Sequence, residues 1–347
     1  MNDKPVGAEK AVCLPVLEAG VDRQIAEQIG AAVKQAKSAL ITGHERPDGD
    51  CIGSEIALCA MLRQQGLESC IVNADAAERY RFLEPADWIH TVRPDEKFSA
   101  DLVFILDATD LTRLGRVKPE QLGPASHFIN VDHHLGNTNF GRVNWVDPKA
   151  AATGELLWRL AAYCGWPVPL AGLRALYTAL VTDTGQFSYA TTSPVVLRMA
   201  AYLIENGVNP EQVWRQVYSS RTRTELALEA RARASLACTP DGKICSIGLT
   251  ARDFAETGGT PMDCEQFPNI PRSLAGVELA LFFYELNGGT STKASIRSTP
   301  RLDARALAQK FSGGGHRQAA GCTLPLPLAE AWKLVLEQAA ELVKREG

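Results

Sequence analysis

Hydrophobic residues along the first half of the chain follow two patterns, one typical of helices and one typical of buried strands. Apolar positions 25, 29, 33 and 36 recur at helical spacing and predict a helix before a short strand at 39–41. A second helix is predicted from about 54 to 65, and apolar runs at 70–72, 102–106 and 127–131 predict further strands. Strands buried on both faces and separated by helices indicate an α/β domain with a doubly wound, mainly parallel sheet.

The pattern changes twice further along the chain. From residue 151 to about 220 the apolar spacing predicts several helices, one of them starting at Ser193-Pro194, and a charged stretch at 221–236 predicts a connector helix. The last third predicts a turn at 240–243, a hairpin across 277–296, a helix near 303–311 and a C-terminal helix from about 328. We therefore predict two domains, 1–220 and a smaller α+β domain at 237–347.

Composition excludes several classes of protein. The 347 residues include 36 basic and 40 acidic side chains, and this slight acidity argues against a protein that grips long nucleic acids through many phosphates. Hydrophobic residues make up 46%, which excludes a largely disordered chain. No run approaches the ~20 apolar residues of a membrane helix, and the N-terminus lacks the pattern of a signal peptide. We therefore expect a cytoplasmic protein that does not bind membranes.

Cysteine usage supports the same location. The nine cysteines are scattered singly, their number is odd, and none forms a Cys-x-x-Cys pair. This pattern favours reduced thiols over a disulfide framework or a zinc ribbon.

The densest group of chemically active residues follows the first predicted strand. His44, Asp48 and Asp50 lie within seven residues, and Pro47 and Gly49 allow tight turns that aim several side chains at one point. Loops at the carboxyl ends of parallel strands form the ligand crevice of such sheets. The alternative interpretation is a polar turn in which Asp48 or Asp50 caps the next helix.

Two later strand ends favour the first interpretation. Asp107 ends the most apolar strand, and Asp132-His133-His134 ends the next one, so these residues are expected at the same edge of the sheet. Asp183 ends an apolar helix and adds a carboxylate, although a helix-end turn residue is a fair alternative. Carboxylates gathered there would repel one another and are expected to hold cations. Asp and His donors without Cys suit Mn²⁺ or Mg²⁺, while Zn²⁺ and Co²⁺ are not excluded.

These residues resemble the motifs of a known family. The segments His44-x-x-x-Asp48-x-Asp50, Asp107, Asp132-His133-His134 and Asp183 resemble the four motifs of the DHH phosphoesterases. Ser312-Gly313-Gly314-Gly315-His316 resembles the GGGH signature of the accompanying DHHA1 domain. The overall size is similar to that of the NrnA-type enzymes, which degrade very short oligoribonucleotides and dephosphorylate 3'-phosphoadenosine 5'-phosphate (pAp). The resemblance implies a DHH domain, a DHHA1 domain and an active site in the cleft between them.

The resemblance also implies roles for individual residues. Two Mn²⁺ ions would be held, the first by His44 and Asp48 and the second by Asp50, His133 and Asp183, with Asp107 bridging both. A hydroxide activated by the two ions would attack the phosphate, and Mg²⁺ or Co²⁺ are alternative metals. Asp132 would orient His133. His134, free of metal, would hydrogen-bond the phosphate or protonate the leaving oxygen.

The glycine segment is a weak signal by itself, because a flexible tip would have the same sequence. Residues 290–317 nevertheless carry a local charge of +5 on an acidic protein, which suits a small anionic ligand. By the resemblance, Arg297 would contact a phosphate, His316 a base or sugar, and Gly313, Gly314 and Gly315 would allow close approach of the ligand. Arg113, shortly after Asp107, would offset phosphate charge, or else is a solvated loop arginine.

The expected activity is hydrolysis of oligonucleotides a few residues long to nucleoside 5'-monophosphates, and of pAp to AMP, with short single-stranded RNA and dinucleotides as substrates. The first alternative is a soluble phosphodiesterase for cyclic di-AMP or linear dinucleotides. The second is a non-catalytic nucleotide-binding module, against which the complete set of metal ligands argues. A homodimer is suggested by the resemblance alone.

Overall fold

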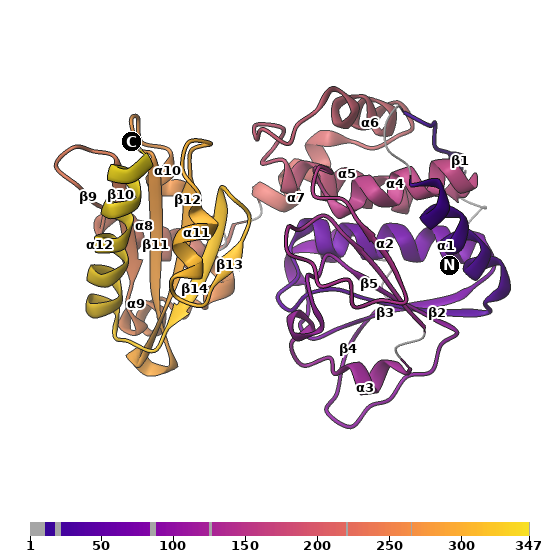
Figure 1. The fold of residues 1–347 in the computed structure, drawn as a ribbon, viewed down its shortest axis with the longest axis horizontal. Coiled ribbons are helices and arrows are strands. Elements are labelled where there is room, and N and C mark those ends of the chain that lie inside the picture. The colour runs from indigo at the N-terminus through magenta and orange to yellow at the C-terminus, as the bar shows by residue number, and fades with distance from the viewer. Residues whose placement is uncertain are drawn as a thin grey trace, which may run out of the picture. The chain divides into compact units, whose positions relative to one another are not determined.

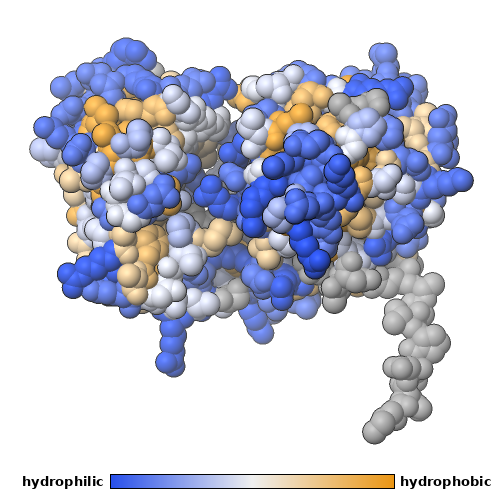
Figure 2. All heavy atoms as spheres, turned by 90° about the horizontal axis from the view of Figure 1, so that it is seen from below, coloured by the Kyte–Doolittle hydropathy of each residue, from blue (hydrophilic) through white to orange (hydrophobic). Residues whose placement is uncertain are grey.

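The structure is a computed structural model that describes residues 11–17, 22–83, 88–124, 127–219, 221–264 and 266–346. The chain divides into two compact units, Met1–Ser220 and Arg221–Gly347, and each is described by itself (Figure 1). Among the described residues, no helix is both long enough and apolar enough to cross a membrane. On the face drawn in Figure 2, hydrophilic residues predominate and hydrophobic residues form separate patches.

The first unit is built on a six-stranded sheet in the order β4–β3–β2–β5–β6–β7. Every neighbouring pair in it is parallel, which confirms the predicted doubly wound α/β domain. The strands are β2 (Ser38–Thr42), β3 (Glu68–Asn73), β4 (Ile89–Thr91), β5 (Leu102–Leu106), β6 (Phe128–Asp132) and β7 (Val143–Val146). A separate antiparallel pair joins β1 (Val12–Cys13) to β8 (Pro167–Val168).

Helices cover both faces of this sheet. Alternate strand residues enter two cores: Ile41 and Phe104 pack in one with α2 and α5, and Leu40 and Val103 pack in the other with α3. Figure 1 shows α2 and α5 on one side of the sheet and α3 on the other. Burial on both faces explains why the strands read as continuous apolar runs. The helices are α1 (Arg23–Gln35), α2 (Gly49–Gln64), α3 (Pro119–Leu122), α4 (Thr153–Cys164), α5 (Leu170–Asp183), α6 (Pro194–Glu205) and α7 (Pro210–Tyr218), with short 3₁₀ turns η1 (Glu78–Leu83) and η2 (Leu111–Leu114).

Helix α2 begins five residues earlier than the apolar pattern predicts. Its N-cap is Asp48, whose carboxylate accepts hydrogen bonds from the main-chain N–H groups of Asp50 and Cys51. Gly49 is therefore the first helical residue and not part of a turn. All residues from 49 to 62 are buried, so the helix has no polar face whose periodicity could mark its first turn.

Two glycines of α2 allow its close contact with α5. A Cβ atom on Gly49 would lie 2.4 Å from Thr182 Cγ2, and one on Gly53 would lie 2.6 Å from the carbonyl oxygen of Ala175. The two helices can thus approach closely enough to bring Asp48 and Asp50 near the end of α5, where Asp183 lies.

The second unit contains a six-stranded mixed sheet in the order β13–β14–β12–β11–β10–β9. Only β10 and β11 are parallel among its described pairs. The helices α8 and α10 lie over one face of this sheet, and α11 and α12 over the other, which confirms the predicted α+β domain. The strands are β9 (Ala237–Cys238), β10 (Ile244–Leu249), β11 (Leu279–Leu286), β12 (Ser291–Ser298), β13 (Gly314–Gly315) and β14 (Ala319–Leu324). The helices are α8 (Arg223–Ala234), α9 (Ala251–Thr257), α10 (Asn269–Arg272), α11 (Ala304–Gln309) and α12 (Leu328–Glu346), with 3₁₀ turns η4 (Pro261–Cys264) and η5 (Asn287–Gly289).

The expectation of reduced thiols throughout is wrong for one pair. Cys238 and Cys245 form a disulfide. The predicted turn at 240–243 folds β9 back onto β10 as an antiparallel pair, and the register places these two cysteines opposite each other. The other seven cysteines, all within the described ranges, are free thiols.

The contact between α2 and α5 generates a stability prediction. Gly53→Ala should lower the free energy of unfolding by about 1–3 kcal/mol, because the added methyl group meets the backbone of α5 and cannot be relieved by a side-chain rotation. Urea unfolding followed by circular dichroism measures this change. In the control variant Gly30→Ala, the new Cβ meets only the Cys164 sulfur at 3.1 Å, so stability should stay the same or rise by up to about 1 kcal/mol through helix propensity. Equal stabilities of Gly53→Ala and the wild type would contradict the account.

Candidate metal centre

Six side chains predicted as metal ligands lie together in the first unit. Parallel strands end at one edge of their sheet, which is why residues after β2, β5 and β6 meet there. Helix α2 contributes its N-cap and first turn, and α5 contributes its last residue. The six residues are His44, Asp48, Asp50, Asp107, His133 and Asp183.

The first group of ligand atoms surrounds His44. Its Nε2 atom lies 3.5 Å from Asp107 Oδ2 and 3.8 Å from Asp48 Oδ1. These separations are longer than hydrogen bonds but suit donor atoms that surround one cation. The three groups can therefore serve as ligands of a single ion.

The second group surrounds His133. Its Nε2 atom lies 3.3 Å from Asp183 Oδ2, 3.6 Å from Asp50 Oδ2 and 3.6 Å from Asp107 Oδ1. The two oxygens of Asp107 thus face the two histidines separately. This is the position that a carboxylate bridging two cations would occupy.

Asp107 has an unusual backbone conformation. Its φ is +55°, in the left-handed region that few residues other than glycine adopt, although Asp tolerates it better than most. Its N–H donates to the carbonyl oxygen of Val131 on the neighbouring strand. Strained backbone of this kind is concentrated at functional sites.

Both metal-facing histidines are oriented by main-chain carbonyls. His44 Nδ1 lies 2.8 Å from the carbonyl oxygen of Glu45, and His133 Nδ1 lies 3.2 Å from that of Ala150. If Nδ1 donates its hydrogen in each case, the lone pair of Nε2 points at the carboxylates. Such a hydrogen bond typically accompanies a histidine that binds a metal.

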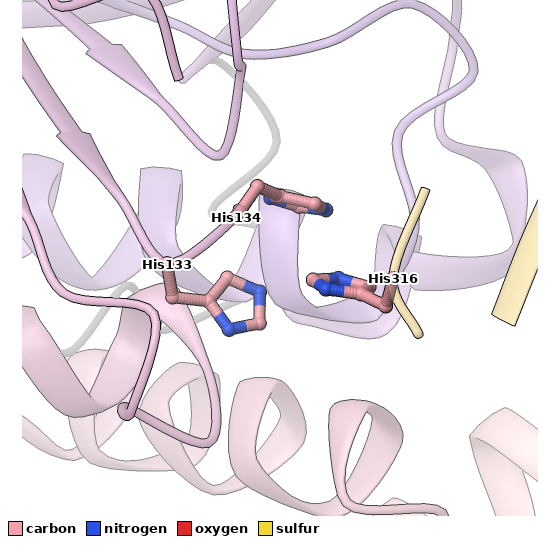
Figure 3. A group of neighbouring side chains, drawn as sticks. All are labelled: His133, His134 and His316. Atoms are coloured by element: carbon pink, nitrogen blue, oxygen red, sulfur yellow. The ribbon is translucent and has the colours of Figure 1, made fainter. Parts of the chain in front are cut away.

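The prediction that Asp132 orients His133 is wrong, because Asp132 contacts the next histidine. Asp132 Oδ1 lies 2.7 Å from His134 Nδ1, and its Oδ2 accepts a hydrogen bond from Asn137 Nδ2 at 2.7 Å. Figure 3 shows His133 and His134 as neighbours, and their rings meet edge to face at a centroid distance of 4.7 Å. Asp132 is the last residue of β6, and its side chain points away from His133, which follows it directly. Its carboxylate therefore reaches His134.

A residue that the sequence analysis missed holds the carboxylates in place. Thr153, the first residue of α4, donates from Oγ1 to Asp107 Oδ1 at 3.0 Å and from its N–H to Asp50 Oδ2 at 2.6 Å. Asp50 Oδ1 also accepts from Ser54 Oγ and from the N–H of Gly154. Thr153 lies about a hundred residues from Asp50, and its small polar side chain at a helix start gave no signal of this role.

The electrostatics of the cluster favour a cation. Burial and the negative charge of Asp107 raise the pKa of Asp50 well above its usual value. Burial likewise raises the pKa of Asp183 to about 6, against the opposing effect of His133. Burial lowers the pKa of His133, but the charges of Asp183, Asp50 and Asp107 outweigh it and raise that pKa to about 10. These raised pKa values mean that bound protons offset the crowded negative charge. Divalent cations would offset it in the same way, so this donor set fits such ions.

Arg113 and the remaining predicted residues lie outside this cluster of six. Arg113 is in η2 with an exposed side chain, and its carbonyl oxygen accepts a hydrogen bond from the N–H of Glu45. Arg297 on β12, the glycine segment and His316 belong to the second unit.

The glycine segment is an edge strand and not a flexible tip, because β13 pairs with β14. A Cβ on Gly313 would lie 2.3 Å from the carbonyl oxygen of Gly321, and one on Gly315 would lie 2.6 Å from that of Ala319. Backbone packing therefore requires two of the three glycines. Gly314 has open space at this position, so packing does not explain it.

Comparison with known proteins agrees with the geometry. Residues 38–180 match the model of the DHH family, N-terminal domain, and residues 246–345 match that of the DHHA1 domain. The chain is 31% identical over 313 residues to a bifunctional oligoribonuclease and PAP phosphatase NrnA of Thermus thermophilus, covering 88% of this chain and 90% of the relative. The chain belongs to the DHH/DHHA1 family. It is therefore an NrnA-type DHH phosphoesterase, a hydrolase of a family that uses divalent metals.

Two further relatives extend the comparison. NrnA of Bacillus subtilis, also a bifunctional oligoribonuclease and PAP phosphatase, is 24% identical over 289 residues, covering 82% of this chain and 88% of the relative. The crystal structure of an exopolyphosphatase-related protein from Bacteroides fragilis has a TM-score of 0.86 and 26% identity. The match covers 95% of this chain and 98% of that protein, so the similarity spans both the DHH and the DHHA1 domains.

Thr153 generates a prediction about metal binding. Thr153→Val removes the hydroxyl donor to Asp107, so the apparent affinity for Mn²⁺ should fall about tenfold or more. The shift of the melting temperature during a Mn²⁺ titration measures this affinity. Thr153→Ser keeps the hydroxyl and should behave like the wild type. If both variants bind Mn²⁺ as tightly as the wild type, Thr153 does not position the ligands.

Glu55 is a buried acid behind the metal ligands. It lies on α2, its Oε2 accepts a hydrogen bond from Asn73 Nδ2 at 2.7 Å, and it is fully buried. Burial raises its pKa from 4.5 to about 8, although the hydrogen bond from Asn73 opposes this shift. The folded protein therefore holds a proton on Glu55 at neutral pH that the unfolded chain releases.

The proton on Glu55 generates a prediction about pH dependence. Between pH 4.5 and 8 the folded state binds more protons at Glu55 than the unfolded state, so stability should fall as pH rises through this window. Glu55→Gln removes this titration. The difference in free energy of unfolding, variant minus wild type, should therefore be higher at pH 8 than at pH 5 by about 2 kcal/mol or more. Urea unfolding at both pH values, with a chelator present throughout, measures the difference. The same pH dependence in both proteins would refute the assignment.

Proposed function

We propose that this DHH phosphoesterase hydrolyses oligoribonucleotides a few residues long to nucleoside 5'-monophosphates and removes the 3'-phosphate of pAp to leave AMP. The observation that carries the proposal is the position of Asp107, whose two oxygens face two separate groups of Asp and His ligands. The relatives named bifunctional oligoribonuclease and PAP phosphatase support the choice of substrates.

The metals that fit the site are two Mn²⁺ ions, with Mg²⁺ or Co²⁺ as alternatives. One ion would be held by His44 and Asp48, and the other by Asp50, His133 and Asp183. Asp107 would be a ligand of both ions. When bound, such ions lower the pKa of water and neutralise charge on the phosphate. The carbonyls of Glu45 and Ala150 keep both histidines in the orientation that this requires.

His134 is suited to hold and move a proton. Asp132 Oδ1 lies within hydrogen-bond distance of His134 Nδ1, so the other ring nitrogen, Nε2, is the one that would act on the substrate. Burial opposes the ionisation of Asp132, but the hydrogen bonds with His134 and Asn137 prevail and lower its pKa to about 2. An ionised Asp132 would accept from Nδ1–H and fix the orientation of the His134 ring, so Nε2 would hydrogen-bond a phosphate oxygen or protonate the leaving oxygen.

The remaining predicted residues would bind the rest of the substrate. Arg297 would contact a phosphate, and His316 would contact a base or sugar. Gly314 is the glycine whose presence packing does not explain, so close approach of a ligand gives it a reason. Arg113 would offset phosphate charge from its exposed position after β5.

A panel of substrates tests the proposal. The wild type with Mn²⁺ should release nucleoside monophosphates from diribonucleotides and phosphate from pAp, and chelation should abolish both reactions. Asp107→Asn should lower turnover at least about a hundredfold, because it weakens both groups of ligands. The control is Asp95→Asn, which changes an exposed carboxylate outside the cluster and should retain activity.

Other outcomes of the panel would overturn the proposal. Exclusive turnover of cyclic di-AMP would favour the soluble cyclic dinucleotide phosphodiesterase. Tight binding of pAp without any product after long incubation in Mn²⁺ would favour a binding module. Wild-type turnover by Asp107→Asn would reject the site itself.

A further inference from the structure

The second unit contains a cavity that the proposed metal chemistry does not use. It lies where the end of β12 meets α10 and the start of β11, and its volume is about 140 Å³. This space holds a phosphate-sized group but not a whole nucleotide. We call this cavity the β12–α10 pocket. Its lining includes Arg272, Glu278, Ala280, Arg297 and Thr299.

Two arginines from different elements line the pocket. Arg272 is the last residue of α10, and Arg297 lies on β12. The residue paired with Arg297 on β11 is Ala280, whose small side chain leaves room beside the guanidinium group. Guanidinium groups present parallel N–H donors that match the oxygens of a phosphate.

The single carboxylate in the lining does not make the pocket acidic. Glu278 Oε1 lies 3.1 Å from Lys243 Nζ and 3.4 Å from Arg301 Nη1. The two arginines of the lining and these two partners of Glu278 thus make four cationic side chains in or beside the pocket, against one carboxylate in the lining. An anionic ligand therefore suits this pocket.

Two buried polar atoms in the lining need partners. Thr299 Oγ1 and the second carboxylate oxygen of Glu278, Oε2, are buried and make no hydrogen bond within the described residues. Buried polar atoms in folded proteins nearly always have a partner. The Thr299 hydroxyl can donate to an anion, and Glu278 Oε2 can accept only from a donor such as a hydroxyl group. The complementary ligand has an anionic group next to a hydroxyl.

We propose that the β12–α10 pocket binds a phosphate that is not cleaved together with an adjacent ribose hydroxyl, and that Arg272 is a second phosphate-binding residue beside Arg297. This inference rests on the proposed function, because pAp and a 5'-phosphorylated dinucleotide both carry a phosphate besides the scissile one. The ligands of the metal centre all belong to the first unit, and none of them is in the lining of the pocket.

A binding measurement tests the pocket without any hydrolysis. AMP and adenosine differ only by the 5'-phosphate, and calorimetric titration of the full chain in a chelator compares them. The wild type should bind AMP at least about tenfold more tightly than adenosine, and Arg272→Met should lose most of that preference. Arg272→Lys keeps the charge but not the paired N–H donors, so its preference for AMP over adenosine should lie between those of the wild type and Arg272→Met. The matched control is Arg252→Met, an exposed arginine on α9 outside the pocket lining, which should retain the wild-type preference.

Kinetics then connect the pocket to the substrate. Arg272→Met should raise KM for a 5'-phosphorylated diribonucleotide about tenfold with kcat nearly unchanged, and should leave KM for its 5'-hydroxyl analogue unchanged. Unchanged AMP preference and KM in a folded Arg272→Met variant would overturn the inference while leaving the proposed function intact. An equal loss of adenosine and AMP binding would also overturn it, because the effect would not concern phosphate. A wild type that binds AMP but cleaves nothing would overturn the proposed function and not the pocket.

Discussion

The repulsion among four carboxylates at one edge of a buried sheet is the constraint on which the rest of the structure depends. Asp48, Asp50, Asp107 and Asp183 converge on two histidines, and their mutual charge together with burial would be costly without positive charge between them. Asp107 sits at the centre, with one oxygen toward each histidine. The hydrogen bonds of Thr153, Ser54 and the carbonyls of Glu45 and Ala150 hold this costly arrangement in place. A site that is so firmly held and so negative is built for divalent cations.

Much of this arrangement could be predicted from the sequence because strand order in a parallel sheet determines which residues meet. The apolar runs ending in Asp107 and in Asp132 identify two strand ends, and their carboxyl ends must share one edge. The resemblance of the motifs supplied the division of the ligands between two ions, and the distances from His44 and His133 to the carboxylates are compatible with that division.

The features that could not be predicted depend on three-dimensional contacts. Helix α2 is buried all round, so no polar periodicity showed that it starts at Gly49. Thr153 reaches Asp107 only because α4 folds over the sheet edge, and no spacing in the chain encodes that contact. The partner of Asp132 depends on the direction in which one side chain leaves its strand. The Cys238–Cys245 disulfide depends on the register of a short hairpin. The β12–α10 pocket depends on how the short helix α10 packs against the hairpin of β11 and β12 that follows it in the chain.

The most direct measurement of the central claim is the number of Mn²⁺ ions bound per chain. Equilibrium dialysis of the wild type with metal analysis should give two ions, and Asp183→Asn should weaken one of them selectively, whereas Asp107→Asn should weaken both. A wild type that binds one ion or none at saturating Mn²⁺, or an Asp107→Asn variant that still binds two with unchanged affinity, would contradict the account.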